Sequence, residues 1–169
     1  PVTELVVAAL EEAGLEASIV FVPWARGYRM VTERSVEGSF PYIRTAEREE
    51  EVLFSDPLYT AREVVVVAES SSIEFTGAPH SLEDARYCLP LGYAVQPVLR
   101  DLVDRGALQL VRPESMEECT LLVQRGRADF YAPNYLTYSE HRRKTTALRI
   151  SGPALSHTDN FLIVPRDDR

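Results

Sequence analysis

The chain has 169 residues, of which 45% are hydrophobic and 26% charged, and its formal net charge is −8. This composition is typical of one ordinary folded domain or of two small lobes. The acidic excess argues against a nucleic-acid partner, because basic side chains nowhere form the stripe that a phosphate backbone requires. No apolar run approaches the roughly 18 residues of a membrane span. The sequence contains no signal peptide, and Pro1 is typical of a mature or trimmed chain rather than of a natural start.

The first half of the chain alternates between helical and extended patterns. Apolar residues at helical spacing predict a helix over 3–13, which Gly14 ends. The run "EVVVVAE" at 63–69 has no polar alternation, which predicts a strand buried on both faces. The remaining predicted elements are a strand over 17–22, a helix over 23–34, and short strands over 40–42 and 52–54.

The second half repeats this alternation. Ser115 and Glu118 form a capping box that predicts the start of a helix. The other predicted elements are strands over 87–89, 107–111, 128–132, 147–150 and 160–164, and helices over 97–104 and 135–142. Alternating strands and helices favour an α/β architecture with mainly parallel sheets, which bind ligands beyond the carboxyl ends of their strands. The loops "FPYIRTAER" (40–48) and "PLGYAVQP" (90–97) occupy such positions.

No pattern in the sequence indicates a catalyst or a cofactor. His80, His141 and His157 lie far apart beside polar loop residues, which predicts surface positions for all three. Metal-ligating Cys/His spacings, the nucleophile elbow and phosphate-binding glycine motifs are absent from the sequence. Cys88 and Cys119 fit either two buried thiols or one disulfide. The sequence therefore indicates a binding protein rather than an enzyme.

Three segments carry a resemblance to a known family: "PWARGYRMVTERSVEGSFPYIRTAEREEEVLFSDPLY" (23–59), "CLPLGY" (88–93) and "LLVQRGRADFYAPNYL" (121–136). Their order and spacing resemble the type II periplasmic solute-binding proteins of bacterial extracellular solute-binding family 3, which serve polar amino acid ABC transporters. The resemblance implies an α/β, two-lobed fold that closes on a small solute. Lobe one comprises 1–60 and 160–169, and lobe two comprises 61–159. Family members normally carry a further strand before the first helix and a helix at the end, so the resemblance also implies a chain truncated at both ends.

In amino acid binders of this family, the arginine of a Thr-x-x-Arg motif grips the carboxylate of the ligand. The matching positions are Arg48 and Thr45, and a guanidinium offers the paired donors that a carboxylate accepts. The glutamates at 47 and 49–51 either hold this arginine or face water. Tyr42 and Phe40 are candidates to stack on the solute, whereas Trp24 is expected to pack.

Two positions of lobe two depart from the family pattern. Where amino acid binders have a hydroxyl residue after a loop glycine, this chain has Tyr93 after Gly92. Where they have an aspartate for the ammonium of the ligand, five residues after Asp129, this chain has Asn134. A neutral asparagine cannot neutralise a buried ammonium, which weakens the preference for an α-amino acid. Gly126 and Asp129 are expected to form a turn and a structural hydrogen-bond acceptor.

The resemblance further implies a periplasmic location, where a Cys88–Cys119 disulfide is favoured. It implies a monomer that binds an anionic or zwitterionic solute, such as an amino acid, in the inter-lobe cleft and delivers it to a membrane permease. A ligand-binding module of a membrane signalling protein is an alternative. A dehydratase of the same fold is disfavoured, because Asn134 replaces the carboxylate that would act as the base.

Overall fold

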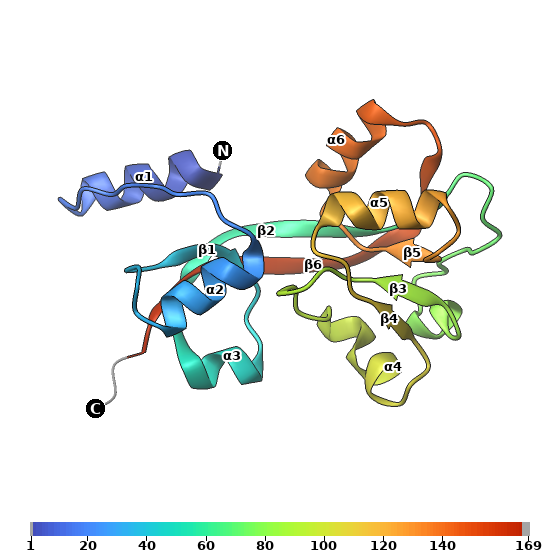
Figure 1. Cartoon of the computed structure of the whole chain (residues 1–169), viewed down its shortest axis with the longest axis horizontal. Helices are drawn as coiled ribbons and strands as arrows, with labels where there is room; N and C mark the ends of the chain where they lie inside the picture. Colours follow the sequence, from blue (N-terminus) through green and yellow to red (C-terminus); the bar gives the residue numbers. More distant parts are fainter. Residues whose placement is uncertain (1, 167–169) are drawn as a thin grey trace. The chain divides into compact units, whose positions relative to one another are not determined.

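A computed structural model describes residues 2–166 of the chain, which divides into two compact units (Figure 1). Unit 1 consists of Pro1–Thr60 with Asp159–Arg169, and unit 2 of Ala61–Thr158. Two long strands, β2 (Val52–Ala68) and β6 (Leu148–Pro165), contribute residues to both units. Each of them replaces two shorter strands predicted from the sequence. The strands form a sheet in the order β1-β6-β2-β5-β3-β4.

Unit 1 packs its elements around a small apolar cluster. They are α1 (Val2–Glu12), α2 (Trp24–Thr32), β1 (Ser39–Tyr42) and α3 (Ala46–Glu51), with the unit 1 portions of β2 and β6. Among the described residues, Val31, Tyr42, Val52 and Ile163 form the buried cluster. β1 pairs antiparallel with β6. A strand that returns from the other unit needs no helical crossover, so the expected parallel pairing is not required here.

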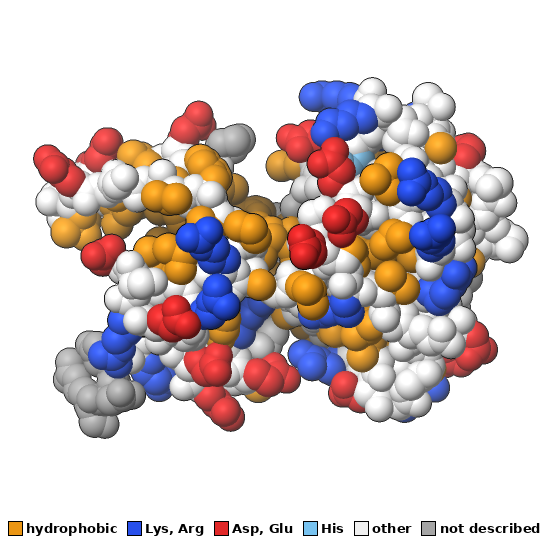
Figure 2. All heavy atoms as spheres, viewed as in Figure 1, with side chains coloured by type: hydrophobic (Ala, Val, Ile, Leu, Met, Phe, Trp, Pro, Cys, Tyr) orange, Lys and Arg blue, Asp and Glu red, His pale blue; other side chains and the backbone are white. Residues whose placement is uncertain are grey.

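The predicted strand over 17–22 is wrong. Residues 15–23 have no regular structure, and the side chains of Val20 and Phe21 are 71% and 85% exposed. A strand is stable only when a neighbour takes up its backbone hydrogen bonds, and no described strand pairs with this segment. The preceding helix α1 also exposes Leu5, and Figure 2 shows hydrophobic and acidic side chains together on the surface of this helix.

Unit 2 contains parallel pairing. β3 (Arg86–Cys88) pairs parallel with both β4 (Gln109–Val111) and β5 (Phe130–Tyr131), whereas β2 pairs antiparallel with β5. Helices α5 (Met116–Gln124) and α6 (Tyr135–Lys144) lie on the opposite side of these strands from α4 (Arg100–Asp104) (Figure 1). Two short 3-10 helices, Pro79–Leu82 and Pro97–Leu99, complete the unit. The α/β fold class is confirmed.

The unit 2 portion of β2 explains how the two sides of this sheet are filled. Val65 and Val67 belong to the cluster on the α4 side, and Val64 and Val66 to the cluster on the α5 side. All four valines are fully buried, which confirms the prediction of a strand buried on both faces.

Covalent and capping contacts fix the helix α5 against this sheet. A disulfide joins Cys88 at the end of β3 to Cys119 in α5, as predicted. The Ser115 side chain accepts a hydrogen bond from the Glu118 amide, so the predicted capping serine is confirmed. The Glu118 carboxylate, however, accepts from the amide of Glu114 rather than from that of the serine.

The turn before β5 has the predicted structural role. Gly126 adopts a φ of 64°, which favours glycine. The Asp129 carboxylate accepts two hydrogen bonds from the Arg86 guanidinium and one from its amide, at 2.7 to 3.0 Å. These contacts hold the pKa of Asp129 below its usual range. Both residues therefore stabilise the fold of unit 2.

Candidate functional site

Arg48 is positioned by a helix that the sequence did not predict. The segment expected to be a loop forms α3, and Thr45 is its N-cap residue. The Thr45 hydroxyl accepts a hydrogen bond from the Arg48 amide at 3.3 Å. An N-cap side chain commonly bonds the amide three residues later, so the Thr-x-x-Arg spacing has a structural cause. The cap sets the direction in which the Arg48 side chain leaves the helix.

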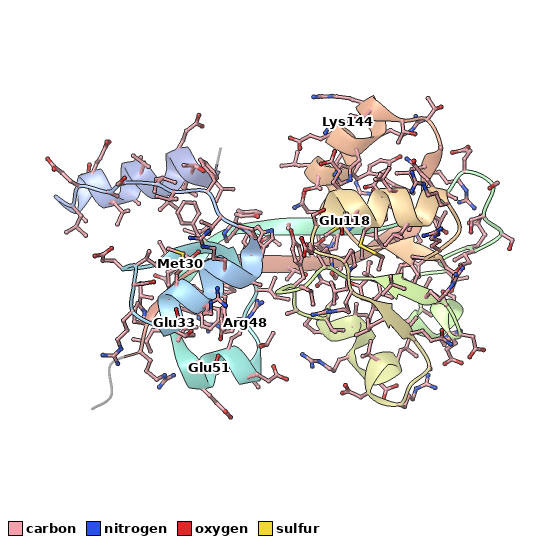
Figure 3. The ribbon with its side chains drawn as sticks, viewed as in Figure 1. Met30, Glu33, Arg48, Glu51, Glu118 and Lys144 are labelled. Atoms are coloured by element: carbon pink, nitrogen blue, oxygen red, sulfur yellow. A yellow bond between two sulfur atoms is a disulfide. The ribbon has the colours of Figure 1, made fainter. Side chains whose placement is uncertain are left out.

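The Arg48 guanidinium lies against two tyrosine rings. Its central carbon lies 5.3 Å from the ring centroid of Tyr28 and 5.2 Å from that of Tyr42. One of its nitrogens, Nη1, donates to the carbonyl of Ile43 at 3.0 Å. Figure 3 shows Arg48 beside α2 and α3. Burial lowers the pKa of Arg48, but an arginine stays charged in proteins. The result is a half-buried cation held in one orientation.

The two tyrosines are themselves held in place. The Tyr28 hydroxyl donates to the Glu51 carboxylate at 2.7 Å, and burial and then this bond raise the pKa of Tyr28. The Tyr42 hydroxyl donates to the carbonyl of Trp24 at 3.1 Å, and their rings meet edge to face at 5.3 Å. Tyr42 is only 4% exposed, so its ring supports Arg48 and is not open to stack on a solute. Trp24 packs, as predicted.

A second arginine of unit 1 has a similar aromatic environment. Arg44 lies over the rings of Phe54 and Phe161, with its central carbon 5.1 Å and 4.7 Å from their centroids. It also forms an ion pair with Glu49 at 3.6 Å. Glu49 thus pairs with Arg44, Glu51 accepts from Tyr28, and the charge of Glu47 acts on Arg48. All four glutamates near Arg48 are exposed.

The predicted site residues of unit 2 lie on two segments. Gly92 adopts a φ of 80°, and Tyr93 beside it packs against the cluster on the α4 side. Asn134 lies on the other segment and is the N-cap residue of α6. Its side-chain oxygen accepts from the Thr137 amide at 2.9 Å. Asn134 also bridges Glu63 of β2 in an antiparallel pair. The structure thus brings a buried carboxyl group opposite the neutral asparagine.

Two residues of this region were missed in the sequence. Glu63 is 6% exposed, and burial raises the pKa of its carboxyl group to about 7. Tyr87 of β3 is fully buried, and its hydroxyl has no hydrogen-bond partner among the described residues. The signal for Glu63 was available, since an acidic residue directly precedes the four buried valines. Tyr87 gave none, because a tyrosine in a strand is ordinary.

One histidine differs from its prediction. His80 and His157 are exposed, but His141 is half-buried on α6. Its Nδ1 lies 3.0 Å from the Thr120 hydroxyl and 3.2 Å from the Tyr131 hydroxyl. Burial lowers the pKa of His141. These contacts hold α6 against α5 and β5, because Thr120 lies in α5 and Tyr131 in β5.

Residues 2–166 provide no group of three His, Cys, Asp or Glu side chains that would hold a metal ion. Within the same residues, none of the helices has the length and apolar character that crossing a bilayer demands.

Comparison with known proteins gives the family. The family model of the bacterial extracellular solute-binding proteins, family 3, matches residues 2–168. The chain belongs to this family. No curated protein matches it.

Solved structures support the fold. Holo ArgBP from T. maritima has 22% identity and a TM-score of 0.81, with 98% of this chain and 72% of that chain covered. The amino acid ABC transporter substrate-binding protein AbpA from Streptococcus pneumoniae, bound to L-arginine, has 17% identity and a TM-score of 0.80, with 98% and 70% covered. An ancestral arginine-binding protein bound to glutamine has 17% identity and a TM-score of 0.79, with 98% and 73% covered. These similarities establish a type II solute-binding fold.

Proposed function

We propose that this protein binds a small solute that carries a carboxylate, an amino acid or a related acid, and delivers it to the permease of an ABC transporter. Membership of the family supports solute binding in general. The observation that carries the carboxylate is Arg48. Its side chain is oriented by the Thr45 cap, by two tyrosine rings and by one main-chain carbonyl. A guanidinium presents donors in a planar fork, and a fixed fork binds a carboxylate with little loss of side-chain entropy.

The similar structures support an amino acid as the solute. Two of them are bound to L-arginine and to glutamine, which share an α-carboxylate and an α-ammonium group and differ in the side chain. Both of these ligands therefore carry the carboxylate group that Arg48 is suited to bind. Thr45 and Arg48 of unit 1 remain candidate contacts of the solute, and so do Gly92, Tyr93 and Asn134 of unit 2.

A location outside the cytoplasm, in the periplasm, completes the proposal. The family is extracellular, and a disulfide such as Cys88–Cys119 persists in oxidising compartments. The protein acts as a receptor and not as an enzyme. It uses no cofactor.

The test is a binding screen of the purified protein. Thermal shift against the standard amino acids, short-chain organic acids and dipeptides identifies ligands, and isothermal titration calorimetry measures their affinities. Binding of an amino acid or a carboxylic acid with a dissociation constant of about 10 μM or tighter supports the proposal. Binding of neutral or purely cationic compounds, with no carboxylate among the ligands, contradicts it.

A further inference from the structure

Glu63 is a buried carboxyl group in an apolar strand. It lies in β2 directly before Val64–Val67, which are fully buried, and only 6% of Glu63 itself is exposed. A buried carboxylate that lacks a counter-charge is costly. Burial is the cause of the raised pKa of about 7. Such a group is retained at a cost to stability, which points to a use beyond packing.

Strand geometry places Glu63 on a definite side of the sheet. Side chains alternate along a strand, and Val65 and Val67 belong to the cluster on the α4 side. Glu63 lies two residues before Val65 in the same strand, so its side chain faces the same side. Asn134 lies beyond β5, which ends at Tyr131, and its side chain turns to the Thr137 amide of α6. Glu63 and Asn134 are directly opposite residues of an antiparallel pair, whose Cβ atoms typically lie about 4.5–5.5 Å apart.

Tyr87 adds an independent observation on the same side. Its ring stacks on that of Phe130, with centroids 4.8 Å apart and planes inclined by 4°. Its hydroxyl is buried and lacks a hydrogen-bond partner among the described residues. The pKa of Tyr87 is raised by burial first and by the charge of Glu63 second, and the charge of Arg112 acts in the opposite direction. A buried hydroxyl without a partner is unfavourable, which indicates a hydrogen-bonding group that fills this position in the functional state.

We propose that Glu63 supplies the negative charge that Asn134 lacks, and that it receives the ammonium group of the solute. This inference rests on the proposed function and narrows it to solutes that carry a cationic amine as well as a carboxylate. An ammonium has three donors and no acceptor. One donor goes to the Glu63 carboxylate. The Asn134 side-chain oxygen stays on the Thr137 amide, where it caps α6.

The inference accounts for the departure of this chain from the family pattern. An aspartate at 134 would stand opposite Glu63, and two carboxylates at that distance repel each other. One carboxylate is sufficient to neutralise one ammonium. In this protein the charge lies on β2 instead of at the start of α6. The specificity for an amine therefore depends on residue 63.

The test compares four proteins that carry a carboxylate at residue 63, at residue 134, at both or at neither. The parent, Glu63→Gln, Asn134→Asp and the double variant are titrated calorimetrically with L-arginine, L-glutamine and the other standard amino acids. Each amino acid is paired with its analogue in which hydrogen replaces the amino group. Glu63→Gln should weaken binding of an amino acid about 100-fold or more, because it leaves the ammonium without its counter-charge. The double variant should recover affinity to within about tenfold of the parent, because aspartate restores the charge and still caps α6.

Controls separate a binding role from a structural one. Glu63→Gln has the same shape as the parent residue, and its thermal midpoint at pH 7 should not fall, because the substitution removes a buried charge. The analogues without the amino group should bind Glu63→Gln at least as tightly as they bind the parent. Glu69→Gln, at an exposed glutamate after β2, should leave all affinities unchanged.

Each outcome decides between the two proposals. If an amino acid binds the parent and Glu63→Gln within about threefold of each other, the role of Glu63 is refuted while the proposed function stands. If the parent binds only carboxylic acids without an amine, the solute class is wrong and Arg48 remains the anchor. If the parent binds no carboxylate at all, the proposed function fails, and the inference about Glu63 fails with it.

Discussion

The two units hold their candidate binding side chains by different means. Among the described residues, unit 2 has apolar clusters of fourteen and eight buried residues on the two sides of its strands, and a disulfide joins β3 to α5. Unit 1 has a cluster of four. Its key side chain, Arg48, is oriented by a helix cap, two aromatic rings and one carbonyl. Local contacts can thus hold a candidate binding group where the surrounding core is small.

The charges of the two candidate anchors also differ. Arg48 keeps its charge although burial lowers its pKa. Glu63 has a pKa of about 7, so its charge depends on the pH of the compartment and on a partner. The arginine is ready to bind before the solute arrives, whereas the glutamate is stabilised in its charged form by a cationic ligand.

The largest effect is expected at Arg48. Arg48→Ala should reduce affinity for the solute by about 3–5 kcal/mol, two to three powers of ten or more, because the carboxylate loses its paired donors. Arg48→Lys should recover only part of this, since a point charge cannot make two parallel hydrogen bonds. Calorimetry measures the three affinities. Arg44→Ala is the matched control, because Arg44 is also held by aromatic rings and lies four residues away. Equal losses for both arginines would mean that the effect is structural.

The disulfide should stabilise unit 2. It closes a loop of 31 residues between Cys88 and Cys119. Replacing both cysteines by serine should lower the free energy of unfolding by about 3–4 kcal/mol in the chain-entropy account. Urea unfolding of parent and variant measures the difference. Thiol titration of the unfolded, unreduced parent should find no free sulfhydryl, and two free thiols would disprove the bond.

Glu63 should make stability depend on pH. Its pKa in the folded protein is raised from 4.5 to about 7, so the folded state holds the proton more tightly than the unfolded state. The contribution of the protonated Glu63 carboxyl group to the free energy of unfolding is fully present below about pH 4.5. It is lost as the pH rises through about 7. The loss is on the order of 3 kcal/mol. Glu63→Gln should remove this slope, and the exposed Glu69→Gln should keep it, in urea titrations at pH 5 to 8. A slope that is identical in parent and Glu63→Gln would show that the carboxyl group titrates normally.

The smallest effect is expected for Asn134→Asp alone. An aspartate at 134 adds a second carboxylate for the ammonium, and we predict a gain of about 1 kcal/mol in affinity for at least one amino acid. Repulsion from Glu63 limits the gain. The cap of α6 is retained, because aspartate is as good an N-cap residue as asparagine. Calorimetry with the standard amino acids measures the change in affinity. Unchanged affinities throughout would mean that residue 134 does not face the solute.

The sequence predicted unit 2 better than unit 1, for physical reasons. The valines of β2 are buried on both faces, so their pattern alone identifies the strand. The segment 17–22 has an equally apolar pattern but no strand beside it, and pairing is a property of the partner as well as of the segment. Helix α3 was missed because its four glutamates have no apolar periodicity; the Thr45 cap starts it.

The sequence predicted part of the candidate site. Arg48 and Thr45 were found through a motif, and the structure places them in contact. Tyr42 was interpreted as a solute contact because aromatic residues near a binding loop often are, yet here it is a wall of the arginine site. Glu63 was missed because its significance depends on the residue opposite, Asn134, which lies 71 positions later (134 − 63). Such long-range pairing leaves no local pattern.

The central claim is that Arg48 binds the carboxylate of the solute, and one comparison tests it most directly. The parent and Arg48→Ala are titrated with the amino acid that the parent binds best and with the amine that remains when its carboxylate is removed. The substitution should weaken binding of the amino acid about 100-fold or more. The affinity for the amine should stay within about threefold of the affinity of the parent. A loss of the same size for both ligands would show that Arg48 does not contact the carboxylate, and would contradict the account.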